Sequence, residues 1–472
     1  MRGGLLVAWL AGAWGAGCAG VSEQEGFDRV SAEVSERSGL EVRWRQGGVE
    51  DAAVDEAVDA LLGSPLTVDS AVQIALLSDP RLQETYERLG VAQGELVQAG
   101  LLNNPLFHAG LGFTDEGVNL ELSVVQSFLD VFFIPMRKRV AAERFEEARL
   151  EVAGEVLAAS WRVRRAFIEH QAALKRHELE RMGFEVADAA LELAMELHRV
   201  GTLSDQLLAA EQLQREQARV SLARAELGVR EGRERLSVLM GLWGQRAGWR
   251  IEAPMAAIPA EPEATEGLER RAVEASLDLA LARQRIVVAL SEAGADNVSS
   301  VLPGVEVGFE AVREDGELEL GPTVGLEVPL FDVGQGRRRG GAARVRGLWR
   351  GYEAAAIELR AEARIASMRL TESRARAIHA RDVLLPLQAQ VLAQTQRSYN
   401  GMLVGGFDLI MARSSLIAVE TQAAEAQRDY WLARADVGLL LQGRHAPLMG
   451  SGRGVEMMEA PSKSGGHRKG GH

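Results

Sequence analysis

The chain has 472 residues, of which 47% are hydrophobic but only 5% are aromatic; Ala, Leu, Glu and Arg dominate, a composition typical of long packed helices. The formal net charge is −14, and no basic stripe runs along either half, which excludes broad nucleic-acid binding. The single cysteine excludes a disulfide framework and any cysteine-based metal cluster.

The first 17 residues are predicted to be a secretory signal peptide. An apolar run from Leu5 to Trp14 ends in small residues directly before Cys18, and it is too short to span a membrane as a mature helix. A cysteine at that boundary resembles the processing site of bacterial lipoproteins, whose thiol receives the lipid. The resemblance makes Cys18 the expected lipid anchor, with Ala19 favouring retention at the outer membrane. The alternative is an ordinary signal peptide whose cysteine is incidental.

Residues 18–64 are charged and punctuated by glycine, and they are expected to form an extended or partly helical leader, peripheral to the body. Pro65-Leu66-Thr67 then opens a helix, with Thr67 as its N-cap. Apolar residues recur at helical spacing from Val72 to Leu96, and Asn103-Asn104-Pro105 ends the helix.

Two segments alternate apolar and polar residues with the period of two that predicts β-strands. The first hairpin occupies residues 105–128 and the second occupies residues 303–331. Each has one apolar face, and each is flanked only by helices. A soluble sheet half-buried on a core is the ordinary interpretation, but neither hairpin has other strands near it in the sequence.

Strands of this kind in a membrane require partners from other chains. An open sheet edge is not tolerated in lipid, and small barrels need about eight strands, twice what one chain supplies. Three chains would supply enough strands for a barrel with a lumen. The need to pair the backbone groups at the edges of the sheet therefore favours a homotrimer if the hairpins lie in a membrane.

Each hairpin leads into a long helix. Residues 129–199 and 337–399 would extend over roughly 105 Å and 95 Å as helices, which exceeds any globular domain. Small and charged residues repeat along both, so we expect close lateral packing with one wet face. Pro386 is expected to kink the second helix. Turn glycines then reverse the chain: Gly201 in the first copy, and Gly401, Gly405 and Gly406 in the second.

Basic clusters mark the start of both long helices: Arg137-Lys138-Arg139 and Arg337-Arg338-Arg339. Such side chains can meet lipid headgroups, whereas a solvated helix start would account for them without any function. Their presence in both copies favours the membrane interpretation.

The chain is predicted to be a duplication. Ser204 caps the first returning helix, which ends at Gly241, and the second ends at Gly443. Matched landmarks lie about 200 residues apart, which indicates one structural unit used twice. The matches are Pro105 with Pro303, Asp130 with Asp332, Gly201 with Gly401, Asp205 with Asp408 and Gly241 with Gly443. The units are residues 65–241 and 266–443, joined by an irregular linker at 242–265 and followed by a disordered tail at 444–472.

Residues 65–443 resemble the TolC-like outer-membrane efflux family. The matching residues are Leu66-Thr67 with Ala71, Ala75 and Pro80; Asn104-Pro105; Val328-Pro329-Leu330-Phe331-Asp332 with Gly336; and Gly201, Ser204-Asp205, Tyr399, Gly401 and Asp408 in the turns. The Pro-Leu-Phe-Asp junction and Pro386 look most like the branch that serves heavy-metal and cation efflux.

The resemblance implies a fold, a location and partners. The fold is mainly α with a small β part: a homotrimer whose twelve-stranded β-barrel, in contact with outer-membrane lipid, continues into an α-helical barrel through the periplasm. Its helix tips form a gated entrance that docks a periplasmic adaptor and an inner-membrane pump. Asp408 matches an acidic position that narrows this entrance in the family, and Met411 stands where a second acidic residue is usual.

Asp408 and Asp205 are the candidate entrance residues, because rings of carboxylates favour cations. Each also lies at the start of a helix, where the N-terminal dipole stabilises Asp. Met402 and Met411 offer soft metal ligands near the tip, but packing is the better interpretation. The eight histidines show no ligand spacing, and His467 and His472 belong to the tail.

We therefore expect no metal, no cofactor and no enzymatic activity, since the sequence has no recognisable nucleophile motif, phosphate-binding loop or metal triad. The favoured function is a passive export channel powered by the pump that it docks. The alternative is a periplasmic coiled-coil lipoprotein, tethered by Cys18, whose hairpins form a soluble sheet without channel activity.

Overall fold

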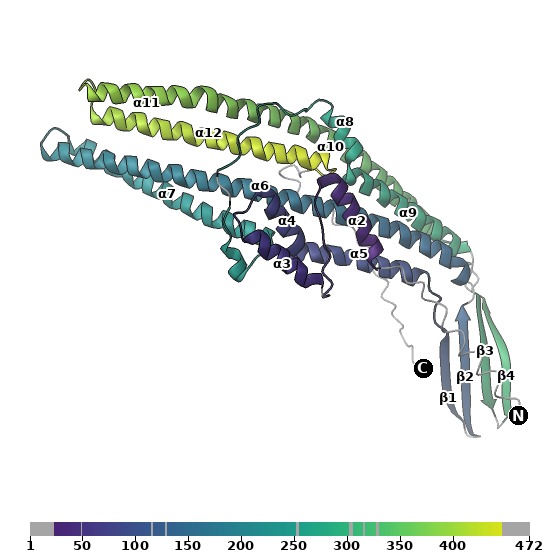
Figure 1. Ribbon diagram of the computed structural model, residues 1–472. Helices are drawn as coiled ribbons and strands as arrows, with labels where there is room; N and C mark the ends of the chain where they lie inside the picture. The colour runs from purple at the N-terminus through teal and green to yellow at the C-terminus, as the bar shows by residue number, and fades with distance from the viewer. Residues whose placement is uncertain are drawn as a thin grey trace.

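The computed structural model describes residues 23–48, 50–114, 117–127, 130–251, 254–301, 305–314, 317–326 and 330–445. Within these ranges the protein is an elongated body of helices, with a small sheet extending from one end (Figure 1). The predicted fold class, mainly α with a small β part, is confirmed. The predicted signal peptide, Cys18 and the tail beyond residue 445 lie outside the described residues.

The first repeat opens with two helices, α4 (Val68–Ser78) and α5 (Pro80–Ala99). Thr67 caps α4 as predicted, because its hydroxyl accepts a hydrogen bond from the Ser70 amide at 3.1 Å. The prediction of one continuous helix is wrong: Asp79 caps a new helix at Pro80, and proline has no amide hydrogen with which to continue α4. Strands β1 (Leu106–Thr114) and β2 (Gly117–Ser127), helix α6 (Asp130–Arg199) and helix α7 (Asp205–Leu239) follow.

The second repeat has the same parts in the same order. Its opening helices α8 (Leu268–Ala275) and α9 (Leu277–Val301) are separated by Ser276, whose hydroxyl accepts from the Leu279 amide as an N-cap. Strands β3 (Val305–Glu314) and β4 (Glu317–Leu326) precede α10 (Gln335–His379), α11 (Leu385–Asn400) and α12 (Gly406–Leu441). A π-helical turn, Ala380–Leu384, joins α10 to α11 directly before Pro386. The proline therefore coincides with a change in hydrogen-bond register.

The four strands form one antiparallel sheet in the order β1-β2-β3-β4. The hairpins of the two repeats meet through β2 and β3, where Val124 lies opposite Phe309. One face of the sheet is apolar, and its large side chains are exposed: Phe107, Leu111, Leu122, Val124, Val307, Phe309, Leu320 and Val324. β1 and β4 form the two edges, and neither pairs with a further strand of the described chain.

None of the helices in the described part of the chain is both long enough and apolar enough to cross a membrane.

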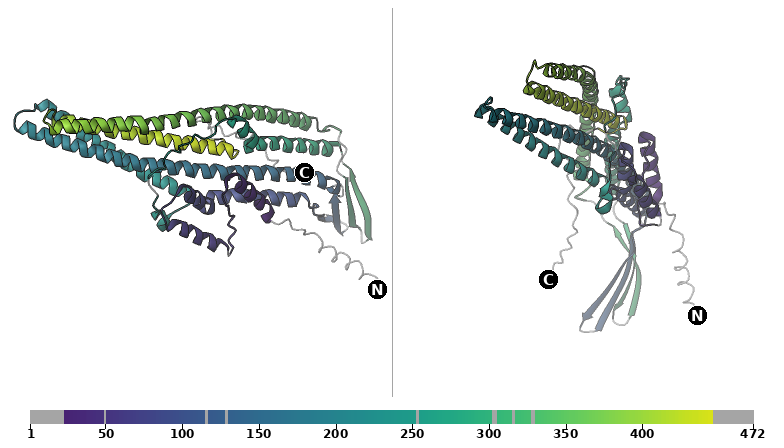
Figure 2. Two further views of the ribbon diagram at one scale, coloured as in Figure 1. Left: turned by 45° about the horizontal axis from the view of Figure 1, so that its top comes forward. Right: turned by 60° about the vertical axis from the view of Figure 1, so that its left-hand side comes forward.

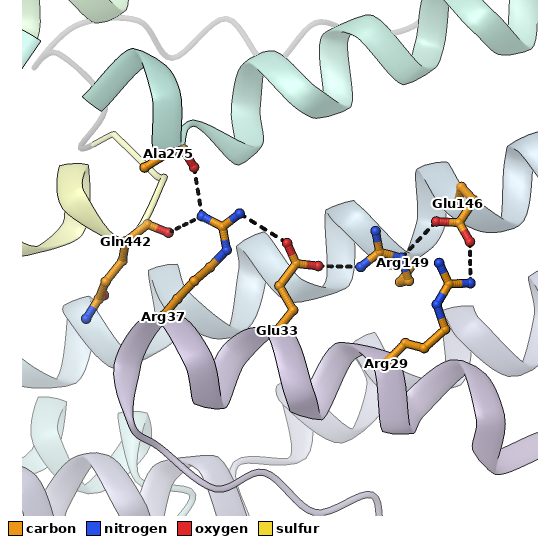
Figure 3. Close-up of polar contacts among 7 residues, drawn as sticks. All are labelled: Arg29, Glu33, Arg37, Glu146, Arg149, Ala275 and Gln442. Atoms are coloured by element: carbon orange, nitrogen blue, oxygen red, sulfur yellow. Dashed lines mark hydrogen bonds and ion pairs between the residues drawn. The ribbon is translucent and has the colours of Figure 1, made fainter. Parts of the chain in front are cut away.

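The leader forms two helices, α2 (Glu23–Ser38) and α3 (Glu50–Leu62). The expectation that it is peripheral is wrong, because its valines are fully buried in a core shared with α4, α5 and α6: Val30, Val34 and Val58. The charges that made α2 look solvated pair with α6 instead. Arg29 pairs with Glu146, and Glu33 pairs with Arg149 (Figure 3).

Trp249 anchors the linker between the repeats. Its side chain is buried, and its indole N–H donates to Ser237 Oγ at 3.0 Å. The guanidinium of Arg233 lies over the ring, 4.5 Å from its centroid, and the buried His170 packs against it edge-on. The linker, which contains the short helix η2 (Gly244–Gly248), is therefore fixed to the body at this point.

We expect the folded chain to lose stability as the pH falls from 6.5 toward 4. Burial, followed by the charge of Arg233, lowers the pKa of His170 from 6.5 to about 4. In this range the unfolded chain takes up a proton and the folded chain does not, so the stabilisation is present above pH 6.5 and is lost on acidification. Urea unfolding of His170→Phe between pH 7 and 5 should show a weaker pH dependence than wild type. An equal pH dependence in His170→Phe and wild type would contradict the prediction.

Candidate functional site

The helix pairs α6/α7 and α11/α12 run side by side to the end of the molecule opposite the sheet (Figure 2). The first tip is closed by two backbone hydrogen bonds: Thr202 N donates to Leu197 O at 2.9 Å, and Gly201 N donates to His198 O at 2.8 Å. Gly201 has a φ of 79°, the left-handed conformation that favours glycine. This is the Schellman arrangement of a helix end.

The helix α7 then begins at a serine cap. The hydroxyl of Ser204 accepts from the Leu207 amide at 3.3 Å, which confirms the predicted cap. Asp205 is the first residue of α7, with a side chain that is 96% exposed, and its Oδ1 lies 3.4 Å from Nε2 of His198. His198 Nδ1 lies 3.0 Å from Leu203 O. His198 of α6 therefore contacts both the turn and the first residue of α7, although so exposed a contact contributes little to stability.

The second tip is closed by the same two backbone hydrogen bonds. They lie one residue later in the chain than the match of Gly401 with Gly201 predicts. Leu403 N donates to Ser398 O at 2.8 Å, and Met402 N donates to Tyr399 O at 2.9 Å. The left-handed residue is Met402, with a φ of 57°, whereas Gly401 has a φ of −84°. Matching Gly401 with Gly201 is therefore wrong by one position. A non-glycine residue in this conformation costs about 1–2 kcal/mol.

Asp408 caps α12 from inside the helix. Gly405 is the N-cap, and Asp408 Oδ2, three residues later, accepts from the Gly405 amide at 2.8 Å. Counted from the two caps, Asp408 occupies the place of Leu207, and Asp205 occupies the place of Gly406. Matching Asp205 with Asp408 is therefore wrong by two positions. Both carboxylates are exposed at the tips, where a ring of copies would attract cations.

Gly406 allows α12 to approach α6 closely. A Cβ atom there would lie 2.8 Å from Leu193 Cδ2 of α6. Next to this contact the two helix pairs separate and leave a groove of about 710 Å³ between α6, α11 and α12, lined by Met182, Val186, Leu392 and Leu409.

Met411 is 63% exposed. Among the residues that the structure describes, no three His, Cys, Asp or Glu side chains are gathered to hold a metal ion.

The two helix pairs are also joined at the end of α12 that lies away from the tips. Asp436 of α12 accepts from Trp161 Nε1 at 2.9 Å and from Arg165 Nη1 at 2.8 Å, both on α6.

Sequence reasoning missed a junction in each repeat, where the end of the return helix meets the break in the opening helices. In the first repeat, Ser78 Oγ donates to Met240 O at 2.7 Å, and a Cβ atom on Gly241 would overlap Ser78 O. In the second repeat, Leu277 N donates to Gly443 O at 2.7 Å. Both glycines are left-handed, with φ of 67° and 99° respectively.

The leader completes the second junction. Ala275 stands where the first repeat has Ser78, and it has no hydroxyl to donate. Arg37 of α2 supplies the donor instead: its Nη1 binds Ala275 O at 2.7 Å and Gln442 O at 3.2 Å (Figure 3).

The beginning of the predicted tail also belongs to the second junction. Arg444 pairs with Asp278, and Nδ1 of His445 lies 2.7 Å from Asp278 Oδ2. Disorder from residue 444 is therefore wrong for these two residues. In the sequence, the only sign of this junction is that the equivalent residues Ser78 and Ala275 differ. They can be recognised as equivalent only once the break between the opening helices is known.

Comparison with known proteins identifies the class of fold. No protein-family model matches the sequence, and no curated protein matches it. Solved structures do match, and among them are outer-membrane channels. The chain has the fold of TolC-like outer-membrane channels, and the resemblance inferred from the sequence is confirmed at the level of the fold.

Three of these structures cover most of the chain. A membrane protein from Pseudomonas aeruginosa matches with a TM-score of 0.65 and 16% identity over 81% of this chain and 94% of that one. The outer membrane protein VceC from Vibrio cholerae matches with a TM-score of 0.62 and 17% identity, covering 80% and 96%. The CmeC outer membrane channel of Campylobacter jejuni has a TM-score of 0.62 and 12% identity, covering 83% and 85%.

Proposed function

We propose that this chain is the outer-membrane channel of a tripartite export system and that it assembles as a homotrimer. The observation that carries the proposal is the sheet, whose apolar face is uncovered and whose two edges are open. Since lipid offers no hydrogen bonds, β1 and β4 need strands from other copies. Three copies of a four-stranded sheet give a closed barrel of twelve strands, wide enough for a lumen.

A stripe on α7 supports the same assembly. α7 packs on α6 along one side, and its opposite side exposes Leu213, Val220 and Leu227, seven residues apart. Apolar residues seven apart form one row along a helix, as one of the two apolar positions of a coiled-coil heptad does. In the trimer the stripe packs against a helix of the neighbouring copy, and the helices close into a barrel below the sheet.

The tips form the periplasmic entrance in this proposal. They lie at the end of the molecule farthest from the sheet (Figure 1), where a periplasmic adaptor and an inner-membrane pump reach the channel. Asp205 and Asp408 line the entrance, and Gly201, Gly401, Gly405 and Gly406 shape the turns. The channel itself is a passive conduit, and the pump supplies the energy.

The geometry of α2 supports Cys18 as the lipid anchor. α2 runs beside α6 from the sheet end downward, with Gly26 against Phe145. Phe145 lies fifteen residues after the start of α6, which is about 22 Å along the helix. Gly26 lies three residues after Glu23, the first residue of α2, which is about 4 Å of helix, and the five residues from Cys18 to Glu23 would reach about 16 Å if extended. Cys18 would then lie close to the sheet end of α6, within the reach of an attached acyl chain.

Electrophoresis and conductance test the proposed function. The full-length protein extracted in mild detergent should run as a trimer that dissociates on heating, and it should conduct ions in planar bilayers. A monomer that an alkaline wash releases from membranes, and that shows no conductance, would support the coiled-coil lipoprotein instead.

Replacing the two tip aspartates should separate charge from capping. We expect Asp408→Ala to lower the cation preference of the channel and to weaken the start of α12 by about 1 kcal/mol, the usual effect of a lost helix cap. Asp205→Ala should lower the cation preference without that loss, because Ser204 supplies the cap of α7. Reversal potentials in a KCl gradient measure the preference. Unchanged potentials in both variants would remove the aspartates from the entrance.

A further inference from the structure

An apolar collar surrounds the connections between the sheet and the helices. Its exposed side chains come from both repeats: Leu101, Leu102, Leu106, Val131, Phe132, Leu330, Phe331 and Val333. Phe132 is 74% exposed and Phe331 is 92% exposed. Aromatic side chains in this place are typical of the girdle where a membrane β-structure meets water.

A set of basic side chains lies directly beyond the collar, and we call it the basic ring. It consists of Arg137, Lys138 and Arg139 on α6, and Arg337, Arg338 and Arg339 at the start of α10. Arg137 donates to Leu101 O at 3.2 Å, and Arg337 pairs with Asp332 at 3.1 Å. Lys138, Arg139, Arg338 and Arg339 are exposed, and none of them forms an ion pair with a described carboxylate.

Helix stability does not account for the arginines of α10. They lie within five residues of its first residue, Gln335, where the helix dipole disfavours positive charge by about 0.3–1 kcal/mol for each residue. No acidic residue follows them before Glu353, so no carboxylate lies one turn further on to offset them. The protein as a whole carries a charge of −14. The basic ring is therefore a local excess of positive charge, which an anion from outside the chain can neutralise.

The spacing of collar and basic ring fits the depth of a lipid headgroup. Lys138 follows Phe132 by six residues on one helix, a rise of about 9 Å. Headgroups extend the bilayer by about 5–8 Å on each side of its hydrocarbon core. With Phe132 at the edge of the hydrocarbon, the charge of Lys138 lies level with lipid phosphates.

We propose that the basic ring binds anionic phospholipid headgroups in the leaflet that faces the helical body. The inference rests on the proposed function, because it requires the sheet to lie in a bilayer. Guanidinium and ammonium groups donate charge-assisted hydrogen bonds to the phosphates, and the acyl chains lie against the collar. The ring thereby selects the lipids that surround the channel.

Spin-labelled lipids test this selection in the full-length trimer reconstituted in phosphatidylcholine. Spin-labelled phosphatidylglycerol should be immobilised at the protein more than spin-labelled phosphatidylcholine, and 0.5 M NaCl should reduce the difference. A charge near a membrane surface is worth about 1 kcal/mol, so each neutralised side chain should lower the relative binding constant at its site about fivefold. We expect this loss for each of the two charges removed in Arg338→Gln/Arg339→Gln and in Lys138→Gln/Arg139→Gln.

The matched control is Arg230→Gln/Arg250→Gln, which removes two exposed charges from α7 and the linker; its lipid preference should equal that of wild type. Equal immobilisation of the two lipids by wild type, or a preference that both ring variants retain, would overturn the basic ring while leaving the channel intact. If neither lipid is immobilised, the protein has not entered the bilayer, and the proposed function fails together with this inference.

Discussion

Phe309→Arg should prevent stable assembly of the protein in the membrane. Phe309 lies on the apolar face between Val124 of β2 and Pro322 of β4, and its side chain is 63% exposed in the single chain. An arginine that faces the middle of a bilayer costs about 2–4 kcal/mol, and a trimer would bear this cost three times. The amount of heat-dissociable trimer in the outer-membrane fraction measures the effect, and we expect almost none.

Ser123→Arg is the matched control. Ser123 lies on the opposite face of the sheet, level with Phe309 and opposite Glu310, so the same new side chain would enter the lumen beside a carboxylate. This variant should assemble like wild type. Equal assembly of the two variants would show that the apolar face does not contact lipid.

Gly241→Ala should be the most destabilising glycine substitution in the first repeat. With Gly241 at a φ of 67°, any Cβ atom there is strained by about 1–2 kcal/mol. That atom would also overlap the Ser78 carbonyl oxygen and lie 2.8 Å from Asp79 Cα. Because both neighbours are backbone, the junction must shift, and we expect a total loss of about 3–5 kcal/mol, at the upper end of single substitutions.

Gly267→Ala is the control that separates the cost of backbone strain from the cost of steric overlap. Gly267 also has a φ of 67°, but a Cβ atom there meets nothing within 4 Å. Urea unfolding should therefore show a loss of only about 1–2 kcal/mol for this variant. Similar losses of unfolding free energy in the two variants would mean that the junction accommodates the added Cβ atom without an energetic penalty. The junction would then not fix the angle between the helices.

Local patterns in the sequence predicted the elements that depend on local chemistry. Alternation predicted the strands, helical spacing predicted α6 and α12, and the hydroxyls of Thr67 and Ser204 predicted two helix starts. Burial of the leader could not be predicted in this way, because the charges of α2 find their partners on α6, more than a hundred residues away. The pairing of β2 with β3 is likewise a contact between distant segments.

The candidate entrance was predicted only in outline. The sequence placed Asp205 and Asp408 near the two turns, and the structure finds them there. Their relation to one another depends on which residue adopts the left-handed conformation, and glycine was the natural choice in both turns. Met402 takes that conformation instead, because the backbone bonds to Ser398 and Tyr399 fix the turn whatever side chain is present.

The contact between Arg37 and Gln442 has a consequence for biogenesis. The two residues lie 405 positions apart, so the donor is synthesised near the beginning of the chain and its acceptor near the end. Loop closure over such a distance is slow and comes after local contacts have formed. Arg37 therefore reaches Gln442 only when translation is almost complete, and until then it can pair with Glu33 of its own helix. Only chains that extend to Gln442 acquire the complete second junction.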